Sequence, residues 1–373
     1  MQDVVLFEEL NAGDKVIGVA TLNSEKSLNA LSLAMAEKLL PQLKKWAKDD
    51  NVACVWLQGA GEKAFCAGGD IVAMYKAMQA EPGKLVSEVE NFFTQEYQLD
   101  YFIQTFPKPL ICWGDGIVMG GGMGLMNGAS HRIVTERSLL AMPEVTIGLY
   151  PDVGATYFLN RMPQGCGLFL GITGATMNAN DALYLNLADH FVGHESKETI
   201  LTQLKELEWG DTEALNKQKV SDLLSSIASS DPTALPTPQV EPHQSLITEL
   251  TDGNDIGDIV TRIVNDETDD KWLARARKNL ANGCPFTSHL VWNQLQQGSD
   301  LSLADCFRLE LTLSCNCAVR GDFAEGIRAL LIDKDKNPQW QHSSVAEVPA
   351  EEVDAFFLPP WGERTHPLAD LDK

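Results

Sequence analysis

Apolar and polar residues follow two periodicities in the N-terminal half of the chain, one typical of strands and one of helices. Lys15 to Leu22 alternates apolar with polar residues, which predicts a strand. Leu31 to Lys48 repeats apolar residues at intervals of three and four, which predicts an amphipathic helix that Pro41 bends. The apolar run from Val52 to Gln58 predicts the next strand.

The same alternation continues further along the chain. Asp70 is in a suitable position to cap a helix that begins directly after it. Asn91 to Gln104 predicts another helix, and strands are expected at Pro109 to Trp113 and at Arg132 to Thr135. Strand and helix alternate up to about residue 195, which indicates an α/β fold class.

The pattern changes after this point. Residues 195–280 are acidic, with short helical pieces and a Ser- and Pro-rich stretch between them. Leu301 to Val319 predicts a long helix, and Asp322 with Glu325 forms a capping pattern for a helix from Phe323 to Ile332. We therefore expect an α/β core over residues 1–200. A mostly helical region follows over residues 201–373, partly loop-like between 205 and 280.

Composition limits the classes of partner. The chain has 373 residues, 44% of them hydrophobic, which is enough for one large domain or two. A formal net charge of −23 argues against non-specific binding to nucleic acid or to an anionic membrane. An anionic small molecule would need a local basic site or a cluster of backbone amides.

Cysteine usage and the N-terminus suggest a compartment. Eight cysteines in predicted core segments favour buried thiols over a disulfide framework. Met1 to Val5 has neither the basic region nor the apolar run of a targeting segment, and no apolar run reaches membrane-spanning length. From these features the sequence predicts a cytoplasmic protein.

Two glycine turns carry the first indication of chemistry. They are Ala67-Gly-Gly-Asp70 and Gly120-Gly-Gly122, and each follows an apolar run and precedes a helical segment. Such turns direct free backbone N–H groups at one point, with a helix N-terminus behind them. Two of them can build an oxyanion hole, which stabilises negative charge on a carbonyl oxygen.

Other uses of these motifs fail on spacing. The dinucleotide fingerprint needs a third glycine where this chain has Met119 or Leu125. Neither a Walker A sequence nor a G-x-S-x-G elbow is present in the sequence. His190 and His194 are four residues apart but have no third ligand nearby, which favours a structural role over a metal site.

Two carboxylates follow the second glycine turn. Glu144 lies in an apolar stretch, where burying a carboxylate costs free energy unless it is paired. Taken alone, Glu144 fits a paired structural acid and a catalytic acid equally well. Asp152 follows a proline and, taken alone, is more typical of a turn residue. Together with the glycine turns, the two acids indicate acyl chemistry on a carbonyl.

The combined motifs resemble the enoyl-CoA hydratase/isomerase, or crotonase, superfamily. Within it, the resemblance is strongest to the branch of 3-hydroxyisobutyryl-CoA hydrolases. The segments that carry the resemblance to the branch are Phe65 to Ile71, Met142 to Gly154, and Arg320 to Asp335 with Pro338 and Trp340. It covers nearly the whole chain and is weakest between residues 205 and 280.

The resemblance implies a crotonase-like spiral of ββα units followed by a helical C-terminal region. It implies that the N–H groups of Gly69 and Gly121 bind the thioester oxygen, and that Glu144, Asp152 and Glu96 lie at the acyl group. The residues that it implies for CoA binding are Lys26, Ser27, Leu28, Ala67, Gly68 and Asp70.

One position separates the branch from the hydratases. Hydratases carry a second catalytic glutamate two residues after the glycine triplet, and this chain has Gly124 there. The resemblance therefore predicts a thioester hydrolase that acts on 3-hydroxyisobutyryl-CoA in valine breakdown. It needs no metal or redox cofactor, since CoA is part of the substrate.

Several alternatives stay open at this stage. Glu144 acts either as nucleophile or as general base, and Asp152 orients the substrate hydroxyl or the water, or moves a proton. A hydratase or isomerase of the same fold and a catalytically silent CoA-binding protein are the competing functions. The expected partner is an acyl-CoA, with no nucleic acid or membrane partner. Members of the superfamily are often trimers or hexamers, so a homo-oligomer is one of the open alternatives for this chain.

Overall fold

The computed structural model describes residues 3–373, whose contacts form two units. Unit 1 contains the chain up to Gly69, Leu99–Leu140 and Met177–Glu241, and unit 2 contains Asp70–Gln98, Ala141–Thr176 and Pro242–Lys373. Each unit therefore combines segments from both sides of residue 200, the boundary that the sequence suggested.

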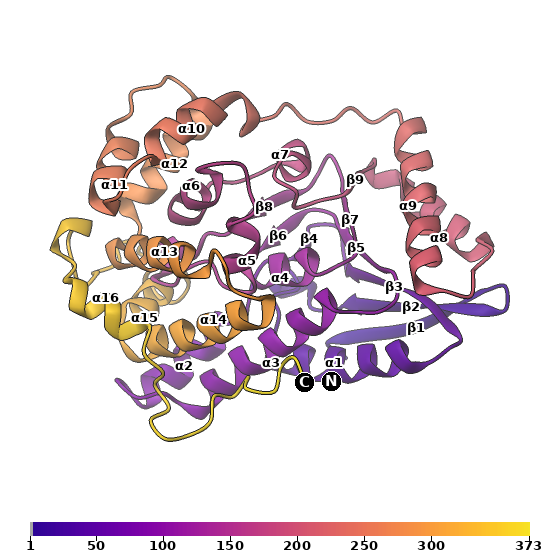
Figure 1. The fold of residues 1–373 in the computed structure, drawn as a ribbon, viewed down its shortest axis with the longest axis horizontal. Helices are drawn as coiled ribbons and strands as arrows, with labels where there is room; N and C mark the ends of the chain where they lie inside the picture. The colour runs from indigo at the N-terminus through magenta and orange to yellow at the C-terminus, as the bar shows by residue number, and fades with distance from the viewer. Residues whose placement is uncertain (1–2) are drawn as a thin grey trace. The chain divides into compact units, whose positions relative to one another are not determined.

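A six-stranded sheet forms the centre of unit 1 (Figure 1). Its strands, in spatial order, are β1 (Val5–Ala12), β2 (Lys15–Leu22), β3 (Val52–Gly59), β5 (Leu110–Gly114), β7 (His131–Val134) and β9 (His190–Phe191). Only β1 pairs antiparallel, and the other pairs are parallel. Parallel strands are normally covered on both faces, and this explains the nearly continuous apolar sequence of β3.

Helices cover the faces of this sheet. Side chains of β2, β3, β5 and β7 form one buried cluster with α8 (Lys197–Glu206) and α9 (Glu213–Ser230). Helix α1 (Leu33–Lys48) contacts the first three strands and buries Trp46 against Gly18. A Cβ at Gly18 would lie 2.7 Å from the indole ring of Trp46, so only glycine lets this helix pack so closely.

A three-stranded sheet presents the two glycine turns. It consists of β4 (Ala64–Cys66), β6 (Ile117–Met119) and β8 (Leu139–Ala141), and β4 pairs parallel with β6. The first glycine turn follows β4 directly, and the second links β6 to α4 (Gly121–Asn127). Because parallel strands end at the same edge of a sheet, this pairing brings the two turns to one edge.

Unit 2 is mostly helical. Its elements before residue 177 are α2 (Ile71–Ala80), the first part of α3 (Ser87–Gln104), the 3₁₀ turn η2 (Glu144–Ile147), α5 (Ala155–Leu159) and α6 (Cys166–Thr173). Its later helices are α10 (Gln244–Thr251), α11 (Ile256–Asn265), α12 (Lys271–Asn282), α13 (Pro285–Gly298), α14 (Leu303–Val319), α15 (Asp322–Ile327) and α16 (Ala350–Phe356). The apolar helix α6 contacts α10, α12 and α13, which makes it the centre of this unit's core.

Most elements expected from periodicity are present within a few residues of the predicted bounds. The expected helix from Phe323 to Ile332 is divided, because α15 ends at Ile327 and one π-helical turn continues to Ile332. The eight cysteines are all buried and none forms a disulfide. Among residues 3–373, no helix combines the length and the apolar character that crossing a membrane requires.

Candidate active site

The segment implied in CoA binding lies beside the first glycine turn in unit 1. Ala67 donates its backbone N–H to the carbonyl of Leu28 (3.1 Å), and Leu31 donates to the carbonyl of Gly68 (2.7 Å). Leu31 also forms a parallel bridge with Gly69. Leu28, Ala67 and Gly68, which the sequence suggested for one ligand, are therefore neighbours.

Lys26 and Ser27 lie in the 3₁₀ turn η1 (Glu25–Ser27), where both side chains are exposed. The turn ends in Leu28 and Asn29, both with positive φ (54° and 56°). Asn29 is buried, and its amide donates to the carbonyls of Ala60 and Ala64 at 2.9 Å each. Asparagine tolerates left-handed backbone better than most residues, so Asn29 fixes this turn. No motif in the sequence marked Asn29 as a site residue.

The two glycine turns are in van der Waals contact. A Cβ at Gly122 would lie 2.2 Å from the carbonyl oxygen of Cys66, and one at Gly68 would lie 3.7 Å from the carbonyl oxygen of Met119. Glycine at position 122 therefore lets the start of α4 approach the end of β4 at backbone distance.

The conformation around Gly121 fits an amide that faces outward. Gly120 precedes α4 with φ 47° and ψ −121°, a combination that other residues avoid. Gly121 is the first residue of α4, so its N–H has no carbonyl acceptor within the helix. The structure thus brings the turns of Gly69 and Gly121 together in unit 1, and their role as an oxyanion hole stays a prediction.

Asp70, the last residue of the first glycine motif, caps α2. Its carboxylate accepts a hydrogen bond from the backbone N–H of Ala73 at 3.3 Å. The sequence-based prediction of Asp70 as an N-cap is therefore confirmed, whereas its contact with CoA stays a prediction. Asp70 belongs to unit 2, whereas its chain neighbour Gly69 belongs to unit 1.

Glu144 opens the 3₁₀ turn η2 and is only 5% exposed. Gly148 ends the turn in the left-handed conformation, and its N–H donates to the carbonyl of Glu144. The Oε2 atom of Glu144 is buried without a hydrogen-bond partner. Burial, and then the nearby charge of Asp152, raise the pKa of Glu144 well above its ordinary value.

Asp152 lies in the same unit and is 4% exposed. Burial raises the pKa of its carboxyl to about 6, and the hydrogen bond that Tyr97 donates to its Oδ2 atom at 2.7 Å opposes this rise. The backbone after Asp152 has positive φ at Val153 (53°) and Gly154 (91°). A left-handed valine is strained, so the surroundings must hold this loop in place.

A chain of buried hydroxyls extends from Asp152. The oxygen of Tyr97 lies 2.6 Å from Oγ of Ser314, which lies 2.8 Å from the oxygen of Tyr150. Tyr150 in turn donates to the backbone carbonyl of Glu310 at 2.6 Å. Single hydroxyl groups in helices, such as Tyr97 and Ser314, or in a loop, such as Tyr150, carry no motif that would have identified them from the sequence.

Glu310 of α14 holds the loop that follows Asp152. Its carboxylate accepts the N–H of Gly154 at 2.7 Å and the N–H of Thr156 at 2.8 Å. The carboxyl is fully buried, which raises its pKa to about 8 although both hydrogen bonds act against the rise. The available signal for this residue was an acid between two leucines in the middle of the predicted helix, Leu309-Glu-Leu311.

Helix α13 adds two further contacts to the same loop. Gln294 donates from Nε2 to the carbonyl of Pro151 at 2.7 Å, and Thr287 donates its hydroxyl to the carbonyl of Leu149 at 2.7 Å. Both side chains are buried. Residues 149–156 are therefore held by side chains of α13 and α14, from the region that the sequence describes only as mostly helical.

Glu96, the third acid implied at the acyl group, is buried in α3 next to Tyr97. Its charge acts on the Tyr97 hydroxyl together with the charges of Asp152 and Glu310. Unit 2 therefore gathers four buried carboxyl groups, at Glu96, Glu144, Asp152 and Glu310. Two of them, Glu144 and Asp152, act directly on each other and can divide the roles of acid and base.

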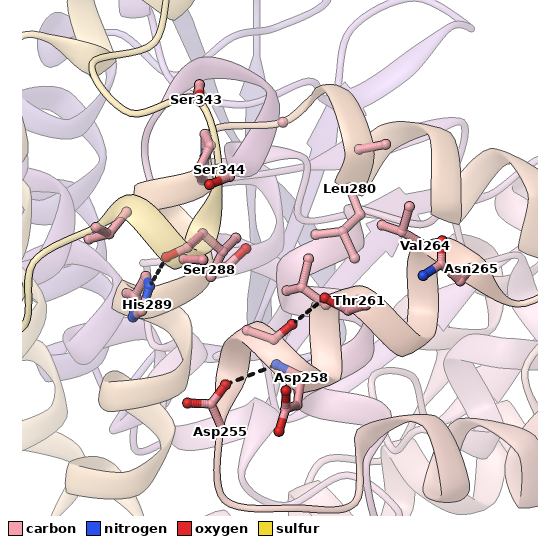
Figure 2. A pocket seen from close by; sticks show the side chains of 18 residues that line it. Asp255, Asp258, Thr261, Val264, Asn265, Leu280, Ser288, His289, Ser343 and Ser344 are labelled. Atoms are coloured by element: carbon pink, nitrogen blue, oxygen red, sulfur yellow. Dashed lines mark hydrogen bonds between the residues drawn. The ribbon is translucent and has the colours of Figure 1, made fainter.

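Unit 2 also contains a cavity of about 750 Å³ away from these acids. Figure 2 shows its lining, which comes from α11, α12, α13 and the segment after Ser343. His289 contacts the carbonyl of Val345 at 2.8 Å, and Asp255 caps α11. The residues proposed for catalysis are not among those that line this cavity, so it is not assigned to thioester chemistry.

Residues 17–357 match the family described as enoyl-CoA hydratase/isomerase. A zebrafish protein named 3-hydroxyisobutyryl-CoA hydrolase, mitochondrial, is 40% identical over 354 residues, which cover 95% of this chain and 89% of that protein. Proteins of the same name from chicken and human are 38% and 34% identical, over 96% and 91% of this chain and 89% and 86% of those proteins. The resemblance that the sequence motifs predicted is therefore confirmed.

Two solved structures match the fold over almost the whole chain. One is described as a carnitinyl-CoA dehydratase from Mycobacterium thermoresistibile, with TM-score 0.84, 34% identity, and coverage of 98% of this chain and 99% of that one. The other is described as an enoyl-CoA hydratase from Rhodobacter sphaeroides, with TM-score 0.82, 32% identity, and coverage of 96% and 98%. The predicted α/β fold class of the crotonase type is confirmed.

The predicted cytoplasmic location is contradicted by the same relatives. The zebrafish, chicken and human proteins are all named as mitochondrial. The prediction rested on a missing targeting pattern at the first residues, and such an absence does not identify a compartment.

The match over residues 17–357 and the relatives at 34–40% identity lead to one conclusion. This chain belongs to the enoyl-CoA hydratase/isomerase family.

Proposed function

We propose that this protein hydrolyses the thioester bond of 3-hydroxyisobutyryl-CoA and releases 3-hydroxyisobutyrate and CoA, a step of valine breakdown. The observation that carries the proposal is the pair of buried carboxyls, Glu144 and Asp152, whose pKa values are both raised. Two acids that oppose each other's ionisation supply one base and one acid near neutral pH, and acyl transfer to water needs both.

The substrate class follows from unit 1 and from the relatives. Leu28 and Ala67 are joined by a backbone hydrogen bond, and the exposed residues Lys26 and Ser27 precede them. We assign this segment, with Gly68 and Asp70, to the CoA part of the substrate. The relatives named 3-hydroxyisobutyryl-CoA hydrolase support the short, branched hydroxyacyl group.

In the proposed reaction, the N–H groups of Gly69 and Gly121 bind the thioester oxygen. Negative charge develops on this oxygen as the carbonyl becomes tetrahedral, and two preorganised amide donors stabilise it. The contact of Gly122 with Cys66 supports this role, because it holds the two turns together before substrate binds.

Glu144 acts on the carbonyl carbon, either as nucleophile, through an anhydride, or as general base on a water molecule. Its buried and unpartnered Oε2 supports both routes, since a carboxylate oxygen without a hydrogen bond is a stronger base and nucleophile. Glu96, in the same buried group, is assigned to contact with the acyl group of the substrate.

A hydratase or dehydratase is the second candidate, because the two solved structures carry such descriptions. Position 124 argues against it. The hydratase route needs a second glutamate there, whereas this chain has Gly124, buried within α4. The single acid pair of unit 2 suits the addition of water to a carbonyl rather than to a double bond.

The test is a thiol-release assay on a small panel of acyl-CoA thioesters. We expect free CoA to appear faster from 3-hydroxyisobutyryl-CoA than from palmitoyl-CoA, because the acids of unit 2 suit a short polar acyl group. Equal or faster turnover of palmitoyl-CoA would reject the proposed specificity. A complete lack of thiol release would reject the hydrolase.

A further inference from the structure

The hydroxyl chain behind Asp152 contains four oxygen–oxygen contacts. They join Asp152 to Tyr97 (2.7 Å), Tyr97 to Ser314 (2.6 Å), Ser314 to Tyr150 (2.8 Å), and Tyr150 to the carbonyl of Glu310 (2.6 Å). Each contact is at hydrogen-bond distance and needs one proton between its two oxygens. The three hydroxyl groups supply only three protons.

If Asp152 is ionised, one contact is left without a proton. Tyr97 then donates to Asp152, Ser314 donates to Tyr97, and Tyr150 donates to the carbonyl of Glu310, which can only accept. Ser314 and Tyr150 then face each other with lone pairs at 2.8 Å. Water cannot supply the missing proton, since the three hydroxyl residues have no exposed surface.

If Asp152 is protonated, every contact has its proton. The carboxylic acid donates to Tyr97, Tyr97 donates to Ser314, Ser314 donates to Tyr150, and Tyr150 donates to the carbonyl of Glu310. The chain is then ordered in one direction. An unpaired polar contact in a buried place costs free energy, so the chain favours this protonation state.

The surroundings of Asp152 also favour its neutral form. Burial raises the pKa of Glu144 further than that of Asp152, which alone would place the shared proton on Glu144, so it is the count of hydrogen-bond protons that assigns the proton to Asp152. The titratable groups that face it are Tyr97 of α3, Glu144 of η2, Tyr150, and Glu310 and Cys317 of α14. None of these groups is a cation, so none of them compensates a negative charge on Asp152. Burial alone raises the pKa of Asp152. The hydrogen bond from Tyr97 lowers this pKa, but only while Tyr97 is the donor.

We propose that the hydroxyl chain of Tyr97, Ser314 and Tyr150 holds the shared proton of the acid pair on Asp152 and so leaves Glu144 ionised. These three residues are then positioning residues, because they act on the reaction through Asp152. The catalytic meaning of this arrangement rests on the proposed thioester hydrolysis, whereas the protonation state itself does not.

The assignment fixes where protons travel in the proposed reaction. When Glu144 activates water, one proton of the water moves to Glu144 and the oxygen bonds to the acyl carbon. The C–S bond then breaks, sulfur keeps the bonding pair, and the proton of Asp152 moves to sulfur to give the free thiol. A proton transfer from Glu144 to Asp152 restores the pair, and the product acid releases its own proton to solvent.

The test is a carbon-13 NMR titration of the substrate-free protein, labelled at the aspartate side-chain carboxyls. The Asp152 resonance is the one that Asp152→Asn removes. Ser314→Ala leaves two contacts and two hydroxyl protons, so an ionised Asp152 becomes fully paired. We expect the pH at which Asp152 loses its proton to fall by about one unit, the equivalent of one ordinary hydrogen bond.

Tyr150→Phe provides an independent second variant, because it removes the same unprotonated contact and predicts the same direction. Thr287→Val is the matched control: it removes a hydrogen bond to the same loop without touching the hydroxyl chain, and should leave the titration unchanged. An unchanged or raised midpoint in the folded Ser314→Ala and Tyr150→Phe proteins would overturn the proposal. Because no substrate is used, failure of the thiol-release assay would reject the proposed function without affecting this result.

Discussion

At the scale of single residues, the chemistry depends on placing charge where a folded protein normally avoids it. Glu144 and Asp152 are 5% and 4% exposed. Glu144 lies in a short 3₁₀ turn and Asp152 in a loop, and neither forms a salt bridge with another residue of the described part of the chain. Burial raises both pKa values, and the charge of Asp152 raises that of Glu144 further, which destabilises the doubly ionised pair. The same interaction therefore lowers stability and supplies the reactivity.

Replacing Glu144 with Gln should abolish most activity while the fold remains. The amide keeps the size of the side chain but can neither attack the carbonyl nor accept a proton. We expect kcat for thiol release to fall by about 10²–10⁴-fold, the typical loss of a general base. A Glu144→Gln protein with near-normal kcat would make Glu144 a structural residue and contradict the mechanism.

Asp152→Asn should raise stability at alkaline pH. The pKa of Asp152 is raised from 3.8 to about 6, so between these pH values the native state keeps a proton that the unfolded chain has released. The free energy of unfolding therefore falls as pH rises through this window, by roughly 3 kcal/mol once above it.

The asparagine variant lacks this loss, and its amide can still donate to Tyr97. Denaturant unfolding should show the variant to be more stable than the native protein at about pH 8 and nearly equal to it at about pH 4. A variant that is less stable at about pH 8 would mean that the carboxylate is well paired in the native state. Its kcat should fall, which separates the effect on stability from the effect on activity.

At the scale of elements, α13 and α14 hold residues 149–156, the loop that contains Asp152. The sequence predicted this part of the chain only as mostly helical. Periodicity predicted the long helix now seen as α14 (Leu303–Val319), but it carries no information on what Glu310 or Ser314 contacts. Those contacts join residues more than 150 positions apart, so they depend on tertiary packing. Glycine turns are easier to predict, because their function is encoded in backbone geometry over a few residues.

Glu310→Gln should loosen this loop. The carboxylate accepts two backbone N–H groups, those of Gly154 and Thr156, whereas a glutamine side chain has only one acceptor oxygen. One buried N–H is left unpaired, so we expect the free energy of unfolding to fall by about 1–3 kcal/mol at about pH 4, where the raised pKa of Glu310 leaves the acid largely neutral in both the folded and the unfolded state. Thermal unfolding and kcat measured together check this: full stability with full kcat would contradict the assigned role.

Gly122→Ala should separate the glycine turns. Its Cβ would lie 2.2 Å from the carbonyl oxygen of Cys66, so α4 must move away from β4. Overpacking of this kind costs about 1–3 kcal/mol, and movement of the Gly121 amide should lower kcat/KM for thiol release.

Gly257→Ala in α11 is the matched control. There the nearest atom is Oδ1 of the capping Asp255 side chain at 3.0 Å, which needs to move by only a few tenths of an ångström, and the better helix propensity of alanine offsets this movement, so we expect a small net effect. If Gly122→Ala behaves like this control in both stability and kcat/KM, the backbone approach of the two turns is unimportant for the reaction.

At the scale of the whole molecule, the two contact units explain why the domain organisation is hard to predict from sequence. The chain passes repeatedly between them, so neighbouring segments such as Gly69 and Asp70 fall in different units. The elements that local periodicity did predict, such as β2, β3, α1 and α14, are present, since each element's apolar face depends on nearby residues. Local periodicity missed β1, whose eight residues do not alternate strictly, and the strands β4, β6, β8 and β9, which have two or three residues each and are too short to show a period.

Family motifs identified the family of the chain, which hydrophobic periodicity does not reveal. Short segments around Gly69, Gly121, Glu144 and Asp152 led to the correct family, and the match over residues 17–357 confirms it. The location was predicted wrongly, because it depended on a pattern absent from the first residues rather than on the folded protein. The residues that support the acids, Tyr97 among them, became visible only through the structure.

The most direct test of the central claim is to identify the products formed from 3-hydroxyisobutyryl-CoA by mass spectrometry. A hydrolase and a hydratase convert this one substrate into mutually exclusive products. Hydrolysis at the carbonyl gives free CoA and 3-hydroxyisobutyrate, which in ¹⁸O-water carries the label in its carboxylate, and this is the result that we predict. Loss of water to give the unsaturated CoA thioester, with the C–S bond intact, would contradict the assignment of Glu144 and Asp152 to thioester hydrolysis.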